Sequence, residues 1–368
     1  MKPIGLYIHI PFCKGKCPYC DFYSVTPHGS VIEDYTAEVC RRLSAETKIF
    51  DTVYFGGGTP SLLGAENICR LLGSVNAADG CEMTLECNPS DTGGRDSNFD
   101  FKAVADAGID RISMGLQSSS DSERRFLGRR AGADDAERAV ERANAAGIDN
   151  ISLDLMLGLA GQSTESVGRS IEFCRRLGAK HLSAYLLKLE QGTPLYTRRN
   201  ELHLPDEDET AELYLFTVSE AAKNGFLQYE ISNFSLPGYE SRHNLKYWRC
   251  EEYLGVGAAA HSFVGGKRFY NERSIADFLE GKPPVNDGDG GDEEEFVMLA
   301  LRLTEGLSGE RFAERYGHML PREFDKKAAF FASKGLMTVG GERYSLTPQG
   351  FLLSNSIIFE LIDTLEAE

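Results

Sequence analysis

The chain has 368 residues, enough for one large domain and a smaller one, and its 42% hydrophobic and 26% charged residues are typical of a globular protein. The formal net charge of -17 gives no electrostatic support to nucleic-acid binding. No run of eighteen apolar residues is present and the first residues lack a signal-peptide pattern, so we expect no membrane span and a cytoplasmic location.

Short β-branched or aromatic runs alternate with stretches of helical period over the first 235 residues. Helices are expected at Val31–Thr47 and at Asp134–Ala146, the second closed by Gly147. The expected strands are Gly5–Ile10, Thr52–Gly57, Glu82–Cys87, Arg111–Leu116, Ile151–Leu157 and His181–Leu187. Six strand–helix units predict an α/β fold, an incomplete (β/α)6 TIM-like barrel, with a doubly wound open sheet as the alternative.

The pattern changes after Pro237, which suggests further regions. The segment Pro283–Glu295 is acidic and rich in glycine, so we expect a linker or an exposed loop. Helical stretches and then a hairpin signal around Gly340-Gly341 indicate a small winged-helix-like domain at the end of the chain. Its balance of 8 Lys and Arg against 10 Asp and Glu over residues 296–368 argues against DNA binding. The expected regions are a core at 1–235, an extension at 236–285, and a linker with a C-terminal domain at 286–368.

Three cysteines, Cys13, Cys17 and Cys20, directly follow the first expected strand. The chain has nine cysteines, and an odd number in a large chain favours reduced thiols over a disulfide framework. Soft thiolate ligands select zinc, copper(I) or iron–sulfur clusters. Zinc usually takes four protein ligands, whereas three cysteines suit a four-iron cluster that keeps one iron open. A zinc site completed by His9 or by a distant residue is the alternative.

Polar residues and glycines stand at or near the ends of the following strands. A carboxylate there can hold hydroxyl or ammonium groups of a ligand, and an arginine can pair with a carboxylate. The residues concerned are Gly57, Gly58, Thr59, Glu86, Gln117, Arg129 and Asp154. Each of them alone has an ordinary structural explanation, such as a helix cap or a surface charge. Together the four polar residues Glu86, Gln117, Arg129 and Asp154 form the convergence that a (β/α) active site requires.

The ordered motifs "YIHIPFC", "GGGTPS", "ECNP", "MGLQS", "LGR" and "DLMLGLAGQ" resemble one branch of the radical S-adenosylmethionine (SAM) superfamily. That branch contains the anaerobic coproporphyrinogen III oxidases and the HemW-type haem chaperones. The resemblance covers about residues 4–265 and implies a radical SAM barrel, a [4Fe-4S] cluster on the three cysteines, and bound SAM. It implies SAM contacts from the strand-end residues above and aromatic contacts from Tyr7 and Tyr19.

Two departures from the oxidase pattern favour the chaperones. Phe22 stands where the oxidases have a further cysteine, and the twelve residues before Cys13 leave no room for their longer N-terminal segment. The motif "HNLKYW" resembles a signature of the HemW-type chaperones and implies haem binding by His243, Tyr247 and Trp248. A histidine packed in an aromatic corner is the structural alternative, and His261 and Cys250 are other candidate haem ligands.

We therefore expect a haem chaperone that binds a [4Fe-4S] cluster, SAM and haem, and delivers haem to an acceptor protein. The resemblance also implies an electron donor for the cluster, and it is compatible with a membrane-associated acceptor and a homodimer. An oxygen-independent coproporphyrinogen III oxidase is the second hypothesis, and a zinc-structured binding module without redox chemistry is the third. The sequence does not decide whether SAM is cleaved, and so whether the protein is an enzyme.

Overall fold

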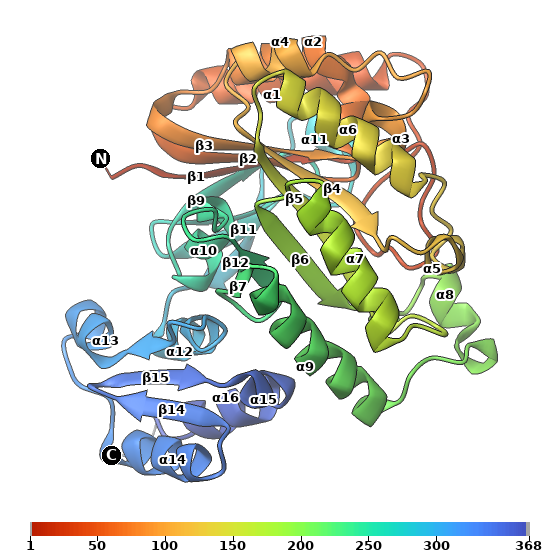
Figure 1. Cartoon of the computed structure of the whole chain (residues 1–368). Coiled ribbons are helices and arrows are strands. Elements are labelled where there is room, and N and C mark those ends of the chain that lie inside the picture. Colours follow the sequence, from red (N-terminus) through yellow and green to blue (C-terminus); the bar gives the residue numbers. More distant parts are fainter. Residues whose placement is uncertain (1, 366–368) are drawn as a thin grey trace.

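The computed structural model describes residues 2–365, which form a large open sheet flanked by helices and a smaller domain at the C-terminal end (Figure 1). The large sheet has twelve strands in the order β12-β11-β10-β9-β1-β2-β3-β4-β5-β6-β8-β7. Its strands are β1 (Ile4–Ile10), β2 (Phe50–Gly57), β3 (Ala77–Cys87), β4 (Arg111–Gln117), β5 (Asn150–Leu157), β6 (His181–Leu186), β7 (Leu227–Gln228), β8 (Asn233–Ser235), β9 (Tyr253–Val256), β10 (His261–Val264), β11 (Lys267–Tyr270) and β12 (Val285–Asp289).

Helices connect these strands, and most of them cover one face of the sheet. Those of the first 250 residues are α1 (Val31–Ala45), η1 (Pro60–Leu63), α2 (Gly64–Leu72), α3 (Pro89–Thr92), α4 (Phe101–Asp106), α5 (Asp121–Phe126), α6 (Ala133–Ala145), α7 (Thr164–Arg176), α8 (Pro194–Thr197), η2 (Arg199–Glu201), α9 (Glu207–Lys223) and α10 (Arg242–Trp248). Helix α10 packs on the other face, where its His243 is hydrogen-bonded to Thr52 of β2. Later in the chain, α11 (Ile275–Leu279) packs near α1. No helix in residues 2–365 is long and apolar enough to cross a lipid bilayer.

Strands β1 to β6 are parallel and follow one another in sequence order, as the alternation of patterns predicted. The sheet does not close on itself within the described residues, because β12 and β7 form its two edges. The prediction of an incomplete barrel is therefore confirmed, and its expected strands match the observed ones to within a few residues. Strand β9 adds to β1 in parallel, and β10 to β12 continue the sheet in antiparallel fashion.

The two faces of the parallel strands differ in chemistry because successive side chains point to opposite faces. One face is apolar and packs against α1, α2, α4, α6 and α7 in a single hydrophobic core. Residues such as Ile8, Phe55, Leu85, Ile112 and Leu153 lie there, each fully buried. The opposite, concave face carries mostly polar and small side chains. This division positions the candidate site on the concave face and at the C-terminal ends of the strands.

The acidic segment Pro283–Glu295, predicted as a linker or an exposed loop, contains regular secondary structure. Val285–Asp289 forms β12, an exposed edge strand that pairs with β11, and α12 (Glu293–Ala300) begins shortly after it. Besides the backbone pairing, Lys267 of β11 forms an ion pair with Asp289 of β12, and the polar side chains of β12 give no strand pattern in the sequence. Asp292 caps α12 by accepting from the Glu295 backbone N–H.

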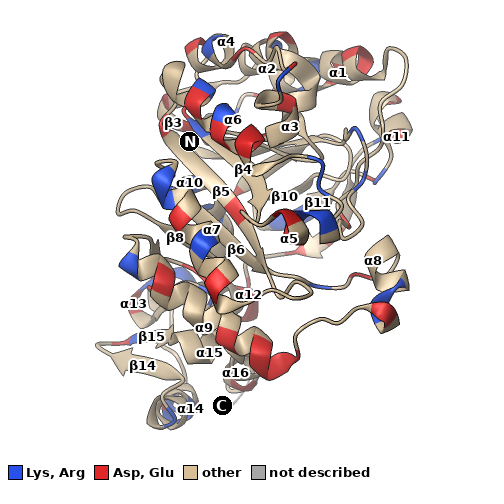
Figure 2. Ribbon diagram, turned by 45° about the vertical axis from the view of Figure 1, so that its right-hand side comes forward, with Lys and Arg blue, Asp and Glu red and all other residues tan. Residues whose placement is uncertain are grey.

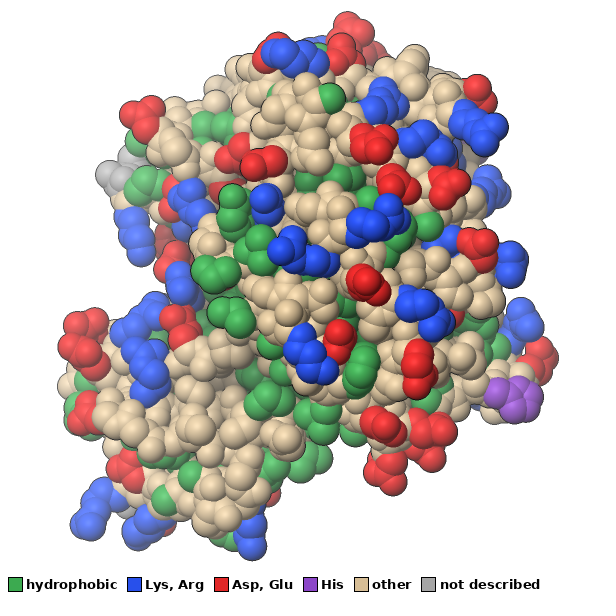
Figure 3. Space-filling model, in the orientation of Figure 1, with side chains coloured by type: hydrophobic (Ala, Val, Ile, Leu, Met, Phe, Trp, Pro, Cys, Tyr) green, Lys and Arg blue, Asp and Glu red, His purple; other side chains and the backbone are tan. Residues whose placement is uncertain are grey.

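The C-terminal domain has a core of its own, around Phe312, Phe324 and Tyr344. Its elements are α12, β13 (Leu307–Ser308), α13 (Gly309–Tyr316), α14 (Arg322–Ser333), β14 (Met337–Gly340), β15 (Arg343–Leu346), α15 (Pro348–Leu352) and α16 (Ser354–Ile362). The predicted hairpin is present, with its two-residue turn at Gly341 and Glu342, both at positive φ. Three helices followed by this hairpin confirm a winged-helix-like arrangement. Lys and Arg are interspersed with Asp and Glu over the molecule (Figures 2 and 3).

Candidate functional site

The three clustered cysteines lie in the loop between β1 and α1. Cys13, Cys17 and Cys20 are half-buried free thiols, and the Cys20 N–H donates to the Cys17 carbonyl at 3.1 Å. Burial raises the pKa of Cys20, and the nearby Cys17 and Cys13 act in the same direction. In residues 2–365, no three His, Cys, Asp or Glu side chains stand together in a geometry that would hold a single metal ion. A donor set of three thiols fits a larger four-iron cluster with one iron left open.

The glycine-rich loop after β2 is joined to the segment that precedes the cysteines. The Gly58 N–H donates to the Ile10 carbonyl at 2.8 Å, and the Thr59 N–H donates to the Phe12 carbonyl at 2.7 Å. The Thr59 hydroxyl lies 3.4 Å from the Cys13 sulfur. A Cβ on Gly58 would meet the Phe12 carbonyl oxygen at 2.6 Å. A side chain at Gly58 would therefore clash with the backbone of the preceding loop. The close approach at this glycine places the backbone of the Gly57–Thr59 loop beside the cysteines.

Glu86 and Asp154 bring two carboxylates to the concave face. The Tyr54 hydroxyl donates to Glu86 at 2.8 Å, and the Ser113 hydroxyl donates to Asp154 at 3.4 Å. Burial, together with the nearby charge of Asp154, raises the pKa of Glu86 to about 7. Burial also raises the pKa of Asp154. The two carboxyls can therefore accept hydrogen bonds from hydroxyl or ammonium groups of a ligand. The carboxyl of Glu86 titrates near neutral pH.

Arg129 and Gln117 meet above the end of β4. Both lie over Gly115, where an added Cβ would contact the Gln117 amide and the Arg129 guanidinium at 2.7 and 3.0 Å. Arg129 donates to the Gly115 carbonyl and approaches the Cys17 sulfur at 3.8 Å. Gln117 has a φ of +68°, a conformation that non-glycine residues rarely adopt outside constrained sites. Arg129 thus links the strand ends to the cysteine loop.

A small cavity of about 130 Å³ lies among these parts. Its walls include Cys17, Thr59 and Arg129, together with Asn88 and Asp91 from the region after β3. Tyr19 is half-buried beside it, and burial raises its pKa. The structure therefore brings residues from the ends of β1 to β4 together around one cavity.

Tyr7 and His9 lie on the concave face of β1. The Tyr7 hydroxyl donates to His9 Nδ1 at 3.1 Å, and His9 Nε2 donates to the Tyr23 carbonyl at 3.1 Å. Tyr7 also stacks on Tyr54, with ring centroids 6.3 Å apart. Burial lowers the pKa of His9 to about 4, so the ring is neutral. Because both nitrogens of His9 are engaged, this arrangement gives no support to His9 as a fourth zinc ligand.

His243 is fully buried. Its Nδ1 lies 2.8 Å from the Thr52 hydroxyl and its Nε2 lies 2.7 Å from the Tyr247 hydroxyl. Burial lowers its pKa to about 3. The backbone N–H of His243 donates to Glu82 at 3.0 Å, which fixes the start of α10 on β3. In this arrangement neither ring nitrogen is free to bind iron, and the packed aromatic corner left open by the sequence is what the structure contains.

The other candidates for haem contacts differ in exposure. Cys250 is buried, with its sulfur 3.6 Å from the Arg315 guanidinium. Trp248 is half-buried at the end of α10. His261 is exposed at the start of β10 and stacks on Tyr270 at 5.2 Å. Of these candidates, His261 is the one whose ring is open to a ligand.

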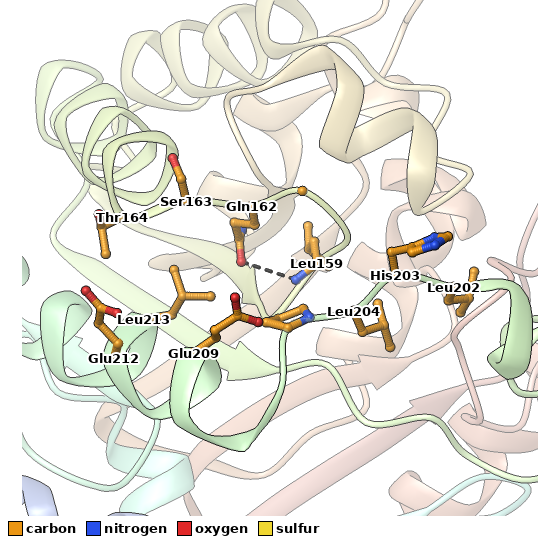
Figure 4. A pocket seen from close by; sticks show the side chains of 12 residues that line it. Leu159, Gln162, Ser163, Thr164, Leu202, His203, Leu204, Glu209, Glu212 and Leu213 are labelled. Carbon is orange, nitrogen blue, oxygen red and sulfur yellow. Dashed lines mark hydrogen bonds between the residues drawn. The ribbon is translucent and has the colours of Figure 1, made fainter.

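A larger cavity of about 700 Å³ lies beside the loop that joins β5 to α7 (Figure 4). Leucine side chains from this loop, from residues 202–204 and from α9 form apolar walls. His203, Glu209 and Glu212 add polar groups, and Gln162 ties the loop together by accepting from the Leu159 N–H at 3.3 Å. Sequence reasoning did not identify this cavity, since its walls come from segments forty residues apart.

The motif order and fold have clear matches among known proteins. The radical SAM superfamily pattern matches residues 7–174, and the HemN C-terminal domain pattern matches residues 293–353. A solved structure of coproporphyrinogen III oxidase (HemN) from Escherichia coli superposes with a TM-score of 0.81 at 19% identity, covering 98% of this chain and 90% of that one. The chain is therefore a radical SAM protein with a HemN-type C-terminal domain.

Relatives that match over nearly the whole chain show to which family of radical SAM proteins it belongs. Heme chaperone HemW from Bacillus subtilis is 36% identical, covering 95% of this chain and 97% of the relative. Heme chaperone HemW from Escherichia coli is 34% identical, covering 97% and 98%. A bovine mitochondrial protein, radical S-adenosyl methionine domain-containing protein 1, is 37% identical over 70% of this chain and 60% of its own length. The chain belongs to the HemW family.

Proposed function

We propose that the protein is a haem chaperone that holds a [4Fe-4S] cluster, binds SAM beside it, and carries haem to an acceptor protein. The observation that carries the proposal is the loop with Cys13, Cys17 and Cys20, because it adjoins a cavity lined by strand-end polar groups. Membership of the HemW family supports the same conclusion. The three thiolates would hold three irons and leave one iron for a ligand.

The residues around the small cavity suit the functional groups of SAM. Arg129 offers a guanidinium for a carboxylate, and the carbonyl oxygens of the Gly57–Thr59 loop are acceptors for an ammonium group. Glu86, Asp154 and Gln117 offer acceptors for hydroxyl groups from the concave face. Tyr7 and Tyr19 would add aromatic surface. When bound, the cluster supplies one-electron chemistry toward SAM, which requires an external electron donor.

Haem binding needs an accessible ligand for iron. His243 becomes available only if its bonds to Thr52 and Tyr247 break and α10 moves, exposing Tyr247 and Trp248 as well. His261 is accessible without such a movement, and His203 lines the cavity of about 700 Å³. Apolar walls and an imidazole are the features that haem sites use. We retain His243 as the first candidate and take His203 and His261 as its competitors.

Oxygen-independent oxidation of coproporphyrinogen III is the second candidate function. The structural likeness to the E. coli oxidase favours it at the level of the fold. Phe22, which occupies the place of the oxidases' further cysteine, is 69% exposed next to Cys20. A phenylalanine cannot ligate a metal, so the chemistry of that additional thiol is missing here. The family membership and this substitution favour the chaperone.

The proposed partners follow from the same reasoning. Delivery of haem requires an acceptor protein, and a membrane-associated acceptor and a chaperone homodimer are both compatible with the proposal. Neither cluster binding nor haem binding by itself identifies the acceptor. Nucleic acid is not among the proposed partners, because the net charge is -17.

An anaerobic haem titration of the reconstituted protein tests the proposal. We expect saturation near one haem per chain, read from the Soret band, and loss or shift of that band in one of the variants H243A, H203A and H261A. The other two variants then serve as matched controls. If the wild-type protein binds no haem, the chaperone proposal fails, and product formation from coproporphyrinogen III with SAM would support the oxidase instead.

A further inference from the structure

The concave face of the sheet contains three buried polar groups without partners, and they lie in one row. Arg111 on β4 pairs in register with Thr84 on β3 and with Asn150 on β5. Neighbouring strands are about 4.8 Å apart, and register partners point to the same face. Thr84 Oγ1, Arg111 Nε and Asn150 Oδ1 are each buried without a hydrogen-bond partner. Buried polar groups in native proteins are nearly always satisfied, so three adjacent exceptions require an explanation.

Arg111 is the unusual member of the row. It is 2% exposed, and no carboxylate of residues 2–365 lies within ion-pair distance of its guanidinium. Arg124, which is 3% exposed, shows the ordinary arrangement in this chain. Its guanidinium donates to the Ser118 carbonyl at 2.6 Å and pairs with Asp121. A buried guanidinium without such partners is costly in the ligand-free protein.

The carboxylates on this face compensate the charge of Arg111 without pairing with it in the described residues. Burial raises the pKa of Glu86 and of Asp154, and the charge of Arg111 opposes that rise. Both lie nearer the C-terminal ends of the strands, where Glu86 is bonded to Tyr54 and Asp154 to Ser113. His181 and His243, which also face this side, are neutral because burial lowers the pKa of each. On β4, Ser113 and Gly115 lie between Arg111 and the strand end, and the Gln117 amide and the Arg129 guanidinium lie over Gly115. A ligand that enters from the strand ends would therefore pass these two side chains before it meets Arg111 beneath the two carboxylates.

We propose that Thr84, Arg111 and Asn150 form a carboxylate-binding site on the concave face. An arginine fork pairs bidentately with a carboxylate, and the hydroxyl and amide beside it complete the hydrogen bonds. Given the proposed function, on which this inference rests, the carboxylate belongs to a propionate side chain of haem. The carboxylate of SAM is the other source with the same chemistry, but Arg129 lies nearer the cysteines and is the better partner for it.

The test compares ligands with and without the carboxylate. Affinities for haem, for haem dimethyl ester and for SAM are measured for the wild type, for R111Q and for the control R176Q, which removes an exposed arginine from α7. We expect R111Q to weaken haem binding at least tenfold, leaving the diester and SAM unchanged, and R176Q to change none of the three. A loss confined to SAM would support the same site with SAM as the source.

Two further measurements separate binding from a structural role. We expect R111Q to melt at the same temperature as the wild type or higher without ligand, because it removes an unpaired buried charge. N150D, which places a carboxylate beside Arg111, should also keep or raise the melting temperature and should weaken haem binding by occupying the guanidinium. Equal losses for haem and its diester, or a large drop in melting temperature for both variants, would overturn the inference. If the wild type binds no haem, the proposed function fails, and the SAM titrations still decide the site.

Discussion

The Tyr54 hydroxyl donates a 2.8 Å hydrogen bond to Glu86, and this bond joins the middle of β2 to the end of β3 across the concave face. Tyr54 also stacks on His243, with ring centroids 5.2 Å apart. The carboxylate proposed to contact SAM is thus connected through one tyrosine to the histidine proposed to contact haem. A change in the protonation or position of Glu86 therefore acts on both halves of the proposed site.

The raised pKa of Glu86 predicts a pH-dependent stability. Burial raises this pKa from 4.5 to about 7, so the folded protein binds a proton more tightly than the unfolded chain does. The stability from Glu86 is complete below pH 4.5 and is lost as the pH rises through 7, by about 3 kcal/mol. We expect E86Q to remove this loss and to be more stable than the wild type at pH 8. Urea unfolding at pH 5 and pH 8 measures the free energy of unfolding at each pH. If E86Q lost as much stability between the two pH values as the wild type, the raised pKa of Glu86 would be contradicted.

Glu230, which lies away from the cysteines, is a control for Glu86 because burial raises the pKa of both carboxyls to about 7. It is fully buried, and burial raises its pKa to about 7 against the opposing effect of nearby donors on Ser232 and Asn233. The sign is the same as for Glu86, so E230Q should also be more stable than the wild type at pH 8. E230Q should leave SAM affinity unchanged, however, whereas E86Q should lower it. Calorimetric titration with SAM separates the two, and equal losses would remove Glu86 from the proposed SAM site.

The sequence predicted the parallel strands well because their apolar faces impose a strong pattern. It did not single out Arg111, because the alternation within one strand does not show which polar side chains meet on neighbouring strands. The register of the sheet shows that Arg111 stands beside Thr84 and Asn150.

The environment of His243 was beyond the sequence for a different reason. Its burial depends on Thr52 and Glu82, which lie on strands more than 150 residues earlier in the chain. A sequence motif gives the residue types, but it does not show which residues from distant parts of the chain bury them. The cysteine loop is the opposite case, because its three residues lie close together in sequence and their proximity in space follows from the chain alone.

The close approach at Gly58 predicts a large effect of a small substitution. In G58A the new Cβ would lie 2.6 Å from the Phe12 carbonyl oxygen and 2.9 Å from the Ile10 carbonyl oxygen, and backbone cannot move aside cheaply. We expect a loss of roughly 1–3 kcal/mol in the free energy of unfolding. G340A, where nothing lies within 4 Å and φ is ordinary, should stay within about 0.5 kcal/mol of the wild type. Chemical denaturation without SAM measures both, and equal effects would contradict this role of Gly58.

The cysteine loop gives the last prediction, which separates cluster ligands from other thiols. Alanine at Cys13, Cys17 or Cys20 should prevent assembly of a full four-iron cluster, because each variant leaves a second iron without a protein ligand. Cys40 on α1 is also a half-buried free thiol, so C40A is the matched control and should assemble the cluster like the wild type. Iron and sulfide content after anaerobic reconstitution, with electron paramagnetic resonance of the reduced protein, reports the outcome. Normal loading in a single-site variant of the loop would show that another residue replaces that cysteine, and loss in C40A would show that loading reports general damage to the fold.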